Sequence, residues 1–184
     1  FTRKSIAVLY FDAHSPDIET EFWCTGMTED VITALAKLGS FDVKSRTDVF
    51  QFKGKEKDSQ EIKKKLNVDA YLEGSLQRSK NRIRITVQLI DANTGLHIWL
   101  EKYDRPIDDI LDIQDEISQK IATTLGLELA DIQEDILEAK PTDNIKAFDF
   151  SSQGIYYYDR KMYDESLAAF NKAIINDPGF SKPN

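Results

Sequence analysis

The stretch from Val68 to Tyr103 constrains the fold most, because three β-rich runs in it are separated by two polar turns. In the middle run, residues 83, 85, 87 and 89 are Ile, Ile, Val and Leu, whereas residues 84, 86 and 88 are Arg, Thr and Gln. Successive side chains of a strand point to opposite faces, so this alternation predicts one buried face and one solvated face. The turns at 79–81 and 91–95 contain Asn and Gly, which suit the positive-φ positions of tight hairpins. The stretch therefore predicts an antiparallel meander.

Upstream of the meander, strand and helix patterns alternate. Residues 5–11 form a nearly continuous apolar run, which is typical of a strand buried on both faces. Residues 58–61 (Asp-Ser-Gln-Glu) resemble a capping box in front of a short helix. The predicted elements are, in order, a strand over 5–11, a polar loop over 12–17, a helix from 25 or 28 to 38, a strand over 41–46, an irregular segment over 49–57 and a helix over 59–66.

The order strand, helix, strand, helix and three strands predicts an α/β (α+β) domain over residues 1–106. We expect a mixed sheet of about five strands, with the helices packed most simply on one face. An α-helical segment then follows the sheet domain.

Residues 107–143 predict an acidic helical connector. Apolar residues from Ile110 to Leu125 recur at helical spacing, and Gly126 interrupts the pattern. The whole chain has a net charge of −8, and residues 104–143 alone hold twelve acidic and three basic residues. This segment is either the solvated face of helices or a surface for a basic partner. We expect no direct binding of nucleic acid, because neutralisation of phosphates dominates that affinity.

Residues 144–184 contain two helical patterns, at about 145–159 and 163–176, after a break at 141–144. The 34 residues from Ala147 to Phe180 resemble one tetratricopeptide repeat, although Gln153 stands where a Leu is usual. The matching positions are Phe150, Gly154, Tyr157, Phe170, Ala173 and Pro178. The resemblance implies that Tyr157 and Phe170 fill the space between two helices. It also implies protein partners in a repeat groove, further repeats in the parent protein and self-association through a bare helical face.

The first 130 residues resemble the TolB-like amino-terminal domain that precedes tetratricopeptide repeats in bacterial adenylate/guanylate cyclase-type proteins and transcriptional regulators. The resemblance is carried by segments 5–9, 26–30, 71–75, 82–86, 89–95, 98–99, 103–105 and 114–117. It implies an α/β accessory module with a non-enzymatic regulatory or scaffolding role in a signalling protein. The alternative is a small-ligand-sensing domain that controls an attached effector such as a nucleotide cyclase.

Candidate chemistry is sparse. The chain has one Cys and two His, and neither imidazole has metal-ligand spacing. We therefore predict no catalytic, cofactor-binding or metal-binding residues. If a small-ligand pocket follows the first strand, Asp12, His14, Trp23 and Cys24 are its candidate lining residues.

A lysine-rich segment leaves two interpretations open. Lys53-Gly54-Lys55 lacks the flanking glycines of a phosphate-binding loop. Together with Lys57, Lys63–Lys65, Phe50 and Phe52 it forms either a solvated surface of mixed charge or a site for an anionic ligand or nucleic acid.

The compartment also stays open. No apolar run approaches the roughly 20 residues of a membrane-spanning helix. The chain starts without Met and opens almost directly onto a strand, so we expect a piece of a longer protein whose upstream part could carry an anchor. The single Cys24 is compatible with the cytoplasm and with the periplasmic side of a membrane-anchored parent.

Overall fold

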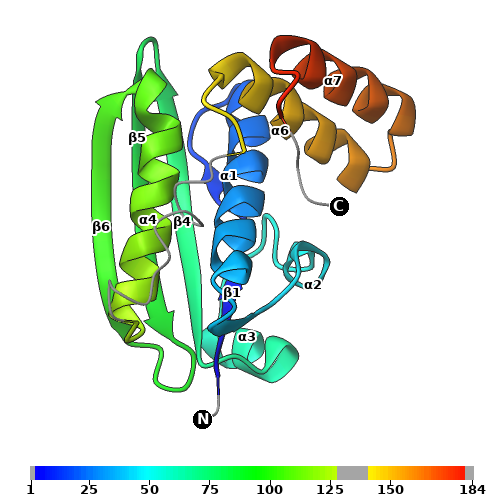
Figure 1. Ribbon diagram of the computed structural model, residues 1–184. Helices are drawn as coiled ribbons and strands as arrows, with labels where there is room; N and C mark the ends of the chain where they lie inside the picture. Colours follow the sequence, from blue (N-terminus) through cyan, green and yellow to red (C-terminus); the bar gives the residue numbers. More distant parts are fainter. Residues whose placement is uncertain (1–2, 128–140, 181–184) are drawn as a thin grey trace.

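The meander forms as predicted, at one side of a mixed six-stranded sheet (Figure 1). This computed structural model describes residues 3–127 and 141–180. The strand order is β3-β1-β4-β5-β6, with a short β2 paired to β4. The strands are β1 (Lys4–Val8), β2 (Asp12–Ala13), β3 (Phe41–Val43), β4 (Ala70–Ser79), β5 (Arg82–Asp91) and β6 (His97–Pro106).

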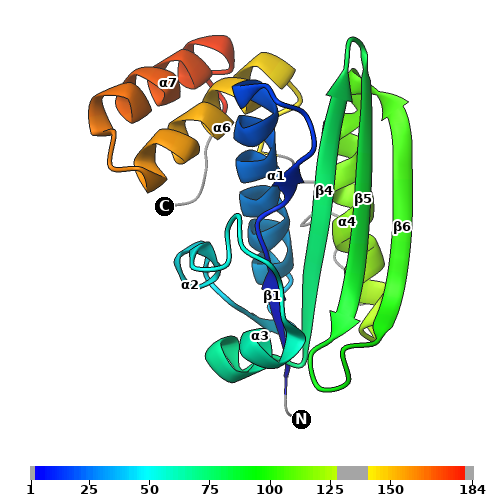
Figure 2. The ribbon, with the colours of Figure 1, turned by 180° about the vertical axis from the view of Figure 1, so that it is seen from behind.

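Strand β5 pairs antiparallel with β4 and β6. Its residues 83, 85, 87 and 89 are fully buried, as the alternation predicts, while Arg84 is exposed. In Figure 2 the opposite face of β4, β5 and β6 is turned to the viewer, and the helix α4 (Ile110–Thr124) lies behind the sheet. In the first turn Lys80, rather than Asn81, takes the positive φ.

Strand β1 lies between β3 and β4 and runs parallel to both. Residues 6–9 are fully buried, which confirms the prediction of a strand covered on both faces. The segment after it was predicted to be a loop, but Asp12 and Ala13 pair with Ser75 and Leu76 of β4. The chain therefore stays on the sheet for two more residues before it turns into the first helix.

The helix α1 (Ile18–Lys37) begins earlier than predicted. Asp17 caps it, because its carboxylate accepts a hydrogen bond from the Thr20 backbone N at 2.8 Å. The first turns contain Phe22, Trp23 and Cys24, all buried, because the sheet packs on one side of α1 and another helix on the other. A helix buried nearly all round shows no single apolar stripe, so the periodicity of this part was uninformative.

The segment after β3 also differs from the prediction. The strand ends at Val43, and Ser45 caps a short helix, α2 (Arg46–Phe50), by accepting from the Asp48 backbone N. The next helix, α3 (Ser59–Leu66), has the predicted bounds. Its capping residue is Asp58, which accepts from the Glu61 backbone N at 2.8 Å.

The helices cover both faces of the sheet, so the expectation of a single covered face was wrong. The helices α1 and α4 cover one face of the sheet (Figure 1). Leu72 pairs with Leu89, which belongs to the buried row of side chains of β5. Tyr71 points to the other face, where its hydroxyl lies 2.6 Å from the Ser59 hydroxyl of α3. The reason is topological. Right-handed crossovers from β1 to β3 and from β3 back to β4 run in opposite directions, which places their helices on opposite faces.

The connector is described only in part. A short 3-10 turn, η1 (Ile107–Asp109), leads into α4. This helix ends at Thr124, with Leu125 as its C-cap, just before Gly126, where the interruption was predicted. The rest of the predicted connector, 128–140, lies outside the described residues. In the parts of the chain that are described, no helix has the length and apolarity to cross a membrane.

The chain ends in a helical hairpin of α6 (Ile145–Asp159) and α7 (Tyr163–Asn176), at the predicted bounds. Gly154 permits close contact of the two helices, since a Cβ there would lie 2.6 Å from the Phe170 ring. The hairpin packs against α1 through α6, and α7 lies on the far side of α6 (Figure 1).

Candidate functional site

The helical hairpin and the sheet domain meet where α6 crosses the first half of α1. The Trp23 indole N donates a hydrogen bond to Asp149 Oδ1 at 2.7 Å, and its ring packs edge-on against Phe148. A Cβ at Gly26 would lie 1.9 Å from Ser152 Oγ, so the two backbones approach closely. This contact makes the helix pair continuous with the core of the sheet domain.

A buried polar network ties the end of α6 to the sheet. The Tyr10 hydroxyl donates to Asp159 Oδ2 at 2.9 Å, and Arg46 pairs with the same carboxylate. Arg46 also contacts Glu29 of α1, with 2.8 Å between Nε and Oε2. Burial, followed by the charge of Asp159, raises the pKa of the Tyr10 hydroxyl, which therefore stays protonated and can donate. The network links the loop after β1, the start of α2 and the end of α6.

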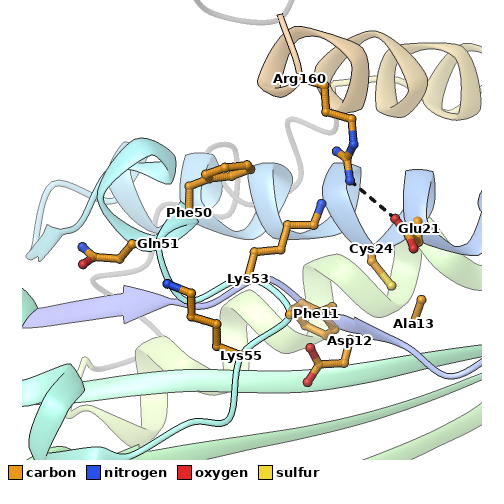
Figure 3. Close-up of a pocket in the computed structure, with 11 residues that line it drawn as sticks. Phe11, Asp12, Ala13, Glu21, Cys24, Phe50, Gln51, Lys53, Lys55 and Arg160 are labelled. Atoms are coloured by element: carbon orange, nitrogen blue, oxygen red, sulfur yellow. Dashed lines mark ion pairs between the residues drawn. The ribbon is translucent and has the colours of Figure 1, made fainter.

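A pocket of ≈ 610 Å³ opens beside this network (Figure 3). Residues after β1, the first turns of α1 and the segment 50–55 line it from the sheet domain. Arg160, which follows α6, lines it from the hairpin. In Figure 3 the side chains of Lys53 and Arg160 extend toward the same space from opposite sides. The pocket is thus formed jointly by the two parts of the chain.

Lys53 has an unusual environment for a lysine. Its Nζ donates to Thr25 Oγ1 at 3.2 Å and lies 4.6 Å from the Tyr10 ring centroid and 5.3 Å from that of Tyr156. Burial lowers its pKa to about 8, and the nearby charge of Arg160 acts in the same direction. Among the described residues, no carboxylate forms an ion pair with Lys53.

Arg160 and the two carboxylates that line the pocket have partners. Arg160 Nη2 lies 3.7 Å from Glu21 Oε2, and the Arg160 guanidinium stacks on the Tyr156 ring at 3.4 Å. Asp12 pairs with Lys57. The two carboxylates of the lining are therefore paired with neighbouring cations. Lys53 forms no ion pair among the described residues, although the charges of Asp159 and Glu21 favour its ammonium form.

The structure separates the four residues proposed as pocket lining. Asp12 and Cys24 line this pocket. His14 instead lines a second pocket of ≈ 420 Å³, which Asp12 also lines and which extends over Glu73 and Gln88. Trp23 lines neither, because it is buried in the contact with α6. Burial raises the pKa of the Cys24 thiol, which disfavours the thiolate that a nucleophile requires.

The lysine-rich segment does not form one continuous basic patch. Lys53 and Lys55 line the pocket, whereas Lys57 pairs with Asp12. Lys65 pairs with Glu61, and Lys63 donates to the Val68 carbonyl at 2.7 Å. Of the lysines in this segment that the sequence singled out, Lys53 and Lys55 line the pocket. Tyr10 and Arg160 were missed, because no local pattern indicates contacts between residues so far apart in the chain.

The repeat-like positions of the hairpin have different surroundings. Ala173 is buried, and Phe170 packs over Gly154. Tyr157 lies 5.6 Å from the Phe22 ring, so it packs the hairpin onto α1 and does not only fill the space between α6 and α7. Phe150 is half-buried below Lys172, and Pro178 follows the end of α7.

Across the described residues, no group of three or more His, Cys, Asp or Glu side chains is placed to hold a metal ion. The pocket presents an ammonium and a guanidinium beside aromatic and aliphatic walls. Such an arrangement can bind a ligand by charge and by apolar contact.

Comparison with known proteins gives two sequence matches. A family model described as "HilA/YgeH-like transcriptional regulator, second domain" matches residues 2–122 and ends before the helical hairpin. A protein of Rhizobium meliloti (strain 1021) named "Putative adenylate cyclase 3" is 37% identical over 182 residues. That alignment includes 97% of this chain and 31% of the relative, so the chain spans about a third of the relative's length.

Solved structures resemble part of this chain at low sequence identity. TolB from Acinetobacter baumannii matches 68% of this chain with a TM-score of 0.50 and 15% identity, over 29% of the TolB chain. The lipoprotein GNA1162 from Neisseria meningitidis matches 65% of this chain with a TM-score of 0.46 and 15% identity, over 99% of its own length. The TolB match shows a shared fold, which agrees with the TolB-like resemblance of the sequence.

Proposed function

The chain belongs, over residues 2–122, to the family of HilA/YgeH-like transcriptional regulator second domains, and we propose that it is a non-catalytic regulatory and protein-interaction module of a larger bacterial signalling protein. The names of the matched proteins support this proposal. One describes a transcriptional regulator and the other an adenylate cyclase, which are different chemistries. A domain common to both is explained most simply by regulation or scaffolding. The effector would then lie in the remaining part of such a protein.

The observation that carries the proposal is the way the hairpin is mounted. The helix α6 is fixed to α1, and α7 faces outward with a row of exposed apolar side chains. Leu167, Ile174 and Ile175 are 62%, 51% and 77% exposed. Apolar patches of this kind mark protein-binding surfaces. We propose that this α7 face is of the tetratricopeptide type and packs against a further helix of a protein partner, or of a second copy.

Light scattering with size-exclusion chromatography tests the role of this face. We expect the wild-type chain to self-associate as its concentration rises and Leu167→Glu to remain monomeric. Lys64→Glu, a change to Glu at an exposed position of α3, away from the hairpin, is the control and should behave as wild type. A wild-type chain that stays monomeric at every concentration would count against α7 as an association surface.

A second candidate function is supported by the pocket. Its lining comes from both the sheet domain and Arg160, so a ligand there would contact both parts of the chain. In this alternative the domain senses a small ligand and controls an attached effector. Calorimetric titration of ligands, combined with hydrogen exchange of α6, tests this alternative.

A further inference from the structure

We propose that the pocket between the sheet and the hairpin binds a small organic anion, a carboxylate or phosphate with an apolar body, held between Lys53 and Arg160. This inference rests on the second of the two proposed functions and specifies its ligand and residues. It differs from the set of lining residues expected from the sequence, of which the structure brings only Asp12 and Cys24 to this pocket.

The position of the pocket favours a ligand. The connection after β1 passes through α1 on one face of the sheet, and the connection after β3 leads to α3 on the other. The connections after these two neighbouring parallel strands therefore leave the sheet toward opposite faces. In α/β sheets, ligands bind at such switch points, outside the carboxyl ends of the strands. The pocket is lined there by Phe11 and Asp12, which follow β1, and by residues 50–55, which follow β3 and α2.

The charges select an anion. Transfer of an ammonium group out of water is unfavourable unless an opposite charge compensates it. Lys53 is held against two aromatic rings, and none of the described carboxylates pairs with it. Burial and the charge of Arg160 lower its pKa, and the more distant charges of Asp159 and Glu21 offset this only in part. The carboxylates that line the pocket, Asp12 and Glu21, are engaged by Lys57 and Arg160.

The walls select an apolar body for the anion. Phe11, Ala13, Cys24 and Phe50 contribute hydrophobic surface beside the cations. The volume of ≈ 610 Å³ lies within the range of about 300–1,000 Å³ that is typical of small-molecule sites. The long Glu21–Arg160 contact of 3.7 Å leaves the guanidinium able to exchange this partner for a ligand oxygen.

Such a ligand would couple the two parts of the chain. It would bridge Lys53 of the sheet domain and Arg160 at the end of α6 (Figure 3). Anything that binds only the docked arrangement stabilises it by mass action. Binding of the anion should therefore reduce opening of the hairpin away from α1.

Calorimetric titration with phenyl phosphate, phenylacetate and the uncharged benzyl alcohol tests the site. We expect saturable binding of at least one of the two anions and none of the alcohol, and the two anions separate phosphate from carboxylate recognition. Lys53→Met should weaken anion binding by about tenfold or more, as expected for the loss of a charge-assisted contact. Lys64→Met, an exposed lysine on α3, is the matched control and should bind as wild type.

The site is contradicted if the wild type binds neither anion, or if Lys53→Met and Lys64→Met bind equally well. If circular dichroism shows that Lys53→Met does not fold, Arg160→Met and the NMR shifts of the residue 51–55 amides in the wild type decide the matter. Shifts there that stay unchanged at high concentrations of both phenyl phosphate and phenylacetate would overturn the proposal. Hydrogen exchange of α6 is measured separately. Anion binding that leaves this exchange unchanged would support the site and contradict ligand sensing.

Discussion

Lys53 is a residue of the proposed ligand site that should lower the free energy of unfolding of the chain. Its ammonium is partly removed from water. It contacts two aromatic rings and one hydroxyl, and the charges of Asp159 and Glu21 stabilise it without forming an ion pair. Natural proteins keep such residues mainly where function requires them. The effect on stability can be measured apart from any ligand.

Lys53→Met should stabilise the chain by about 1–3 kcal/mol at neutral pH, because it removes a buried charge while it keeps the apolar stem. The sign follows from the pKa, which is about 8 in the folded chain and 10.5 in the reference state. Below the folded value both states are protonated, and the full penalty remains. As the pH rises from 8 to 10.5, the folded protein has already released the proton, so wild-type stability increases.

Urea unfolding at neutral pH and above pH 10.5 checks this prediction. The two proteins should become equally stable at the higher pH, and Lys64→Met should match wild type at both. A Lys53→Met variant that is less stable than wild type at neutral pH would show that the contacts with Tyr10 and Tyr156 outweigh the burial of the charge.

Gly26→Ala should destabilise the chain by about 1–3 kcal/mol, because the added methyl group would overlap Ser152. Ala is otherwise the better helix former, so an open position would have become more stable. Chemical denaturation measures the effect. Adding Ser152→Gly to Gly26→Ala should recover part of the loss, because the double variant removes the overlapping atoms. A stabilising Gly26→Ala would mean that α1 and α6 are not in close contact.

Elements whose ends are set by local chemistry could be predicted from the sequence. The helices over 59–66, 145–159 and 163–176 have the predicted bounds, because a cap, a break or a Pro lies beside each. The meander was predicted because its period of two residues is unambiguous over β5. The start of α1 was not predicted, because a helix that is buried on both sides has no single apolar face. The short helix α2 was not predicted either, because its segment shows no clear hydrophobic period.

The candidate site could be predicted only where its residues are neighbours in sequence. Lys53, Lys55 and Phe50 were recognised as a group that could bind an anion, and Asp12 and Cys24 were placed near the first strand. The contribution of Arg160 depends on α6 docking against α1, which no periodicity encodes. Trp23 was misplaced for the same reason, because its partner Asp149 lies in another helix.

The cap of α1 provides a test at the scale of one element. Asp17→Ala should cost about 1 kcal/mol, because the Thr20 backbone N loses its acceptor. Asp17→Asn keeps an acceptor oxygen and removes the charge, so it should remain close to wild type. Thermal unfolding of the two variants distinguishes them. Equal losses would indicate that the charge, including its 4.0 Å approach to Arg78, matters more than the cap.

At the scale of the whole molecule, the hairpin and the sheet domain are joined by an interface that combines packing and buried polar contacts. Trp23, Gly26 and Phe22 of α1 face α6, and Asp159 binds both Tyr10 and Arg46. Contacts of this type make two elements unfold together. Both proposed functions depend on this property, since a loosely tethered hairpin could neither present α7 in a fixed orientation nor complete the pocket.

Native-state hydrogen exchange tests this central claim most directly. In the wild type, the amides of α6 and α1 should exchange with the same opening free energy, because the two helices open as one unit. Asp159→Ala should speed exchange in α6 and α1 together by lowering their shared opening free energy by about 1–3 kcal/mol, because Tyr10 and Arg46 lose a buried partner. Asp164→Ala, a change at an exposed residue of α7, is the control and should leave exchange in α6 unchanged. Exchange in α6 that is much faster than in α1 in the wild type, and unaffected by Asp159→Ala, would contradict the account.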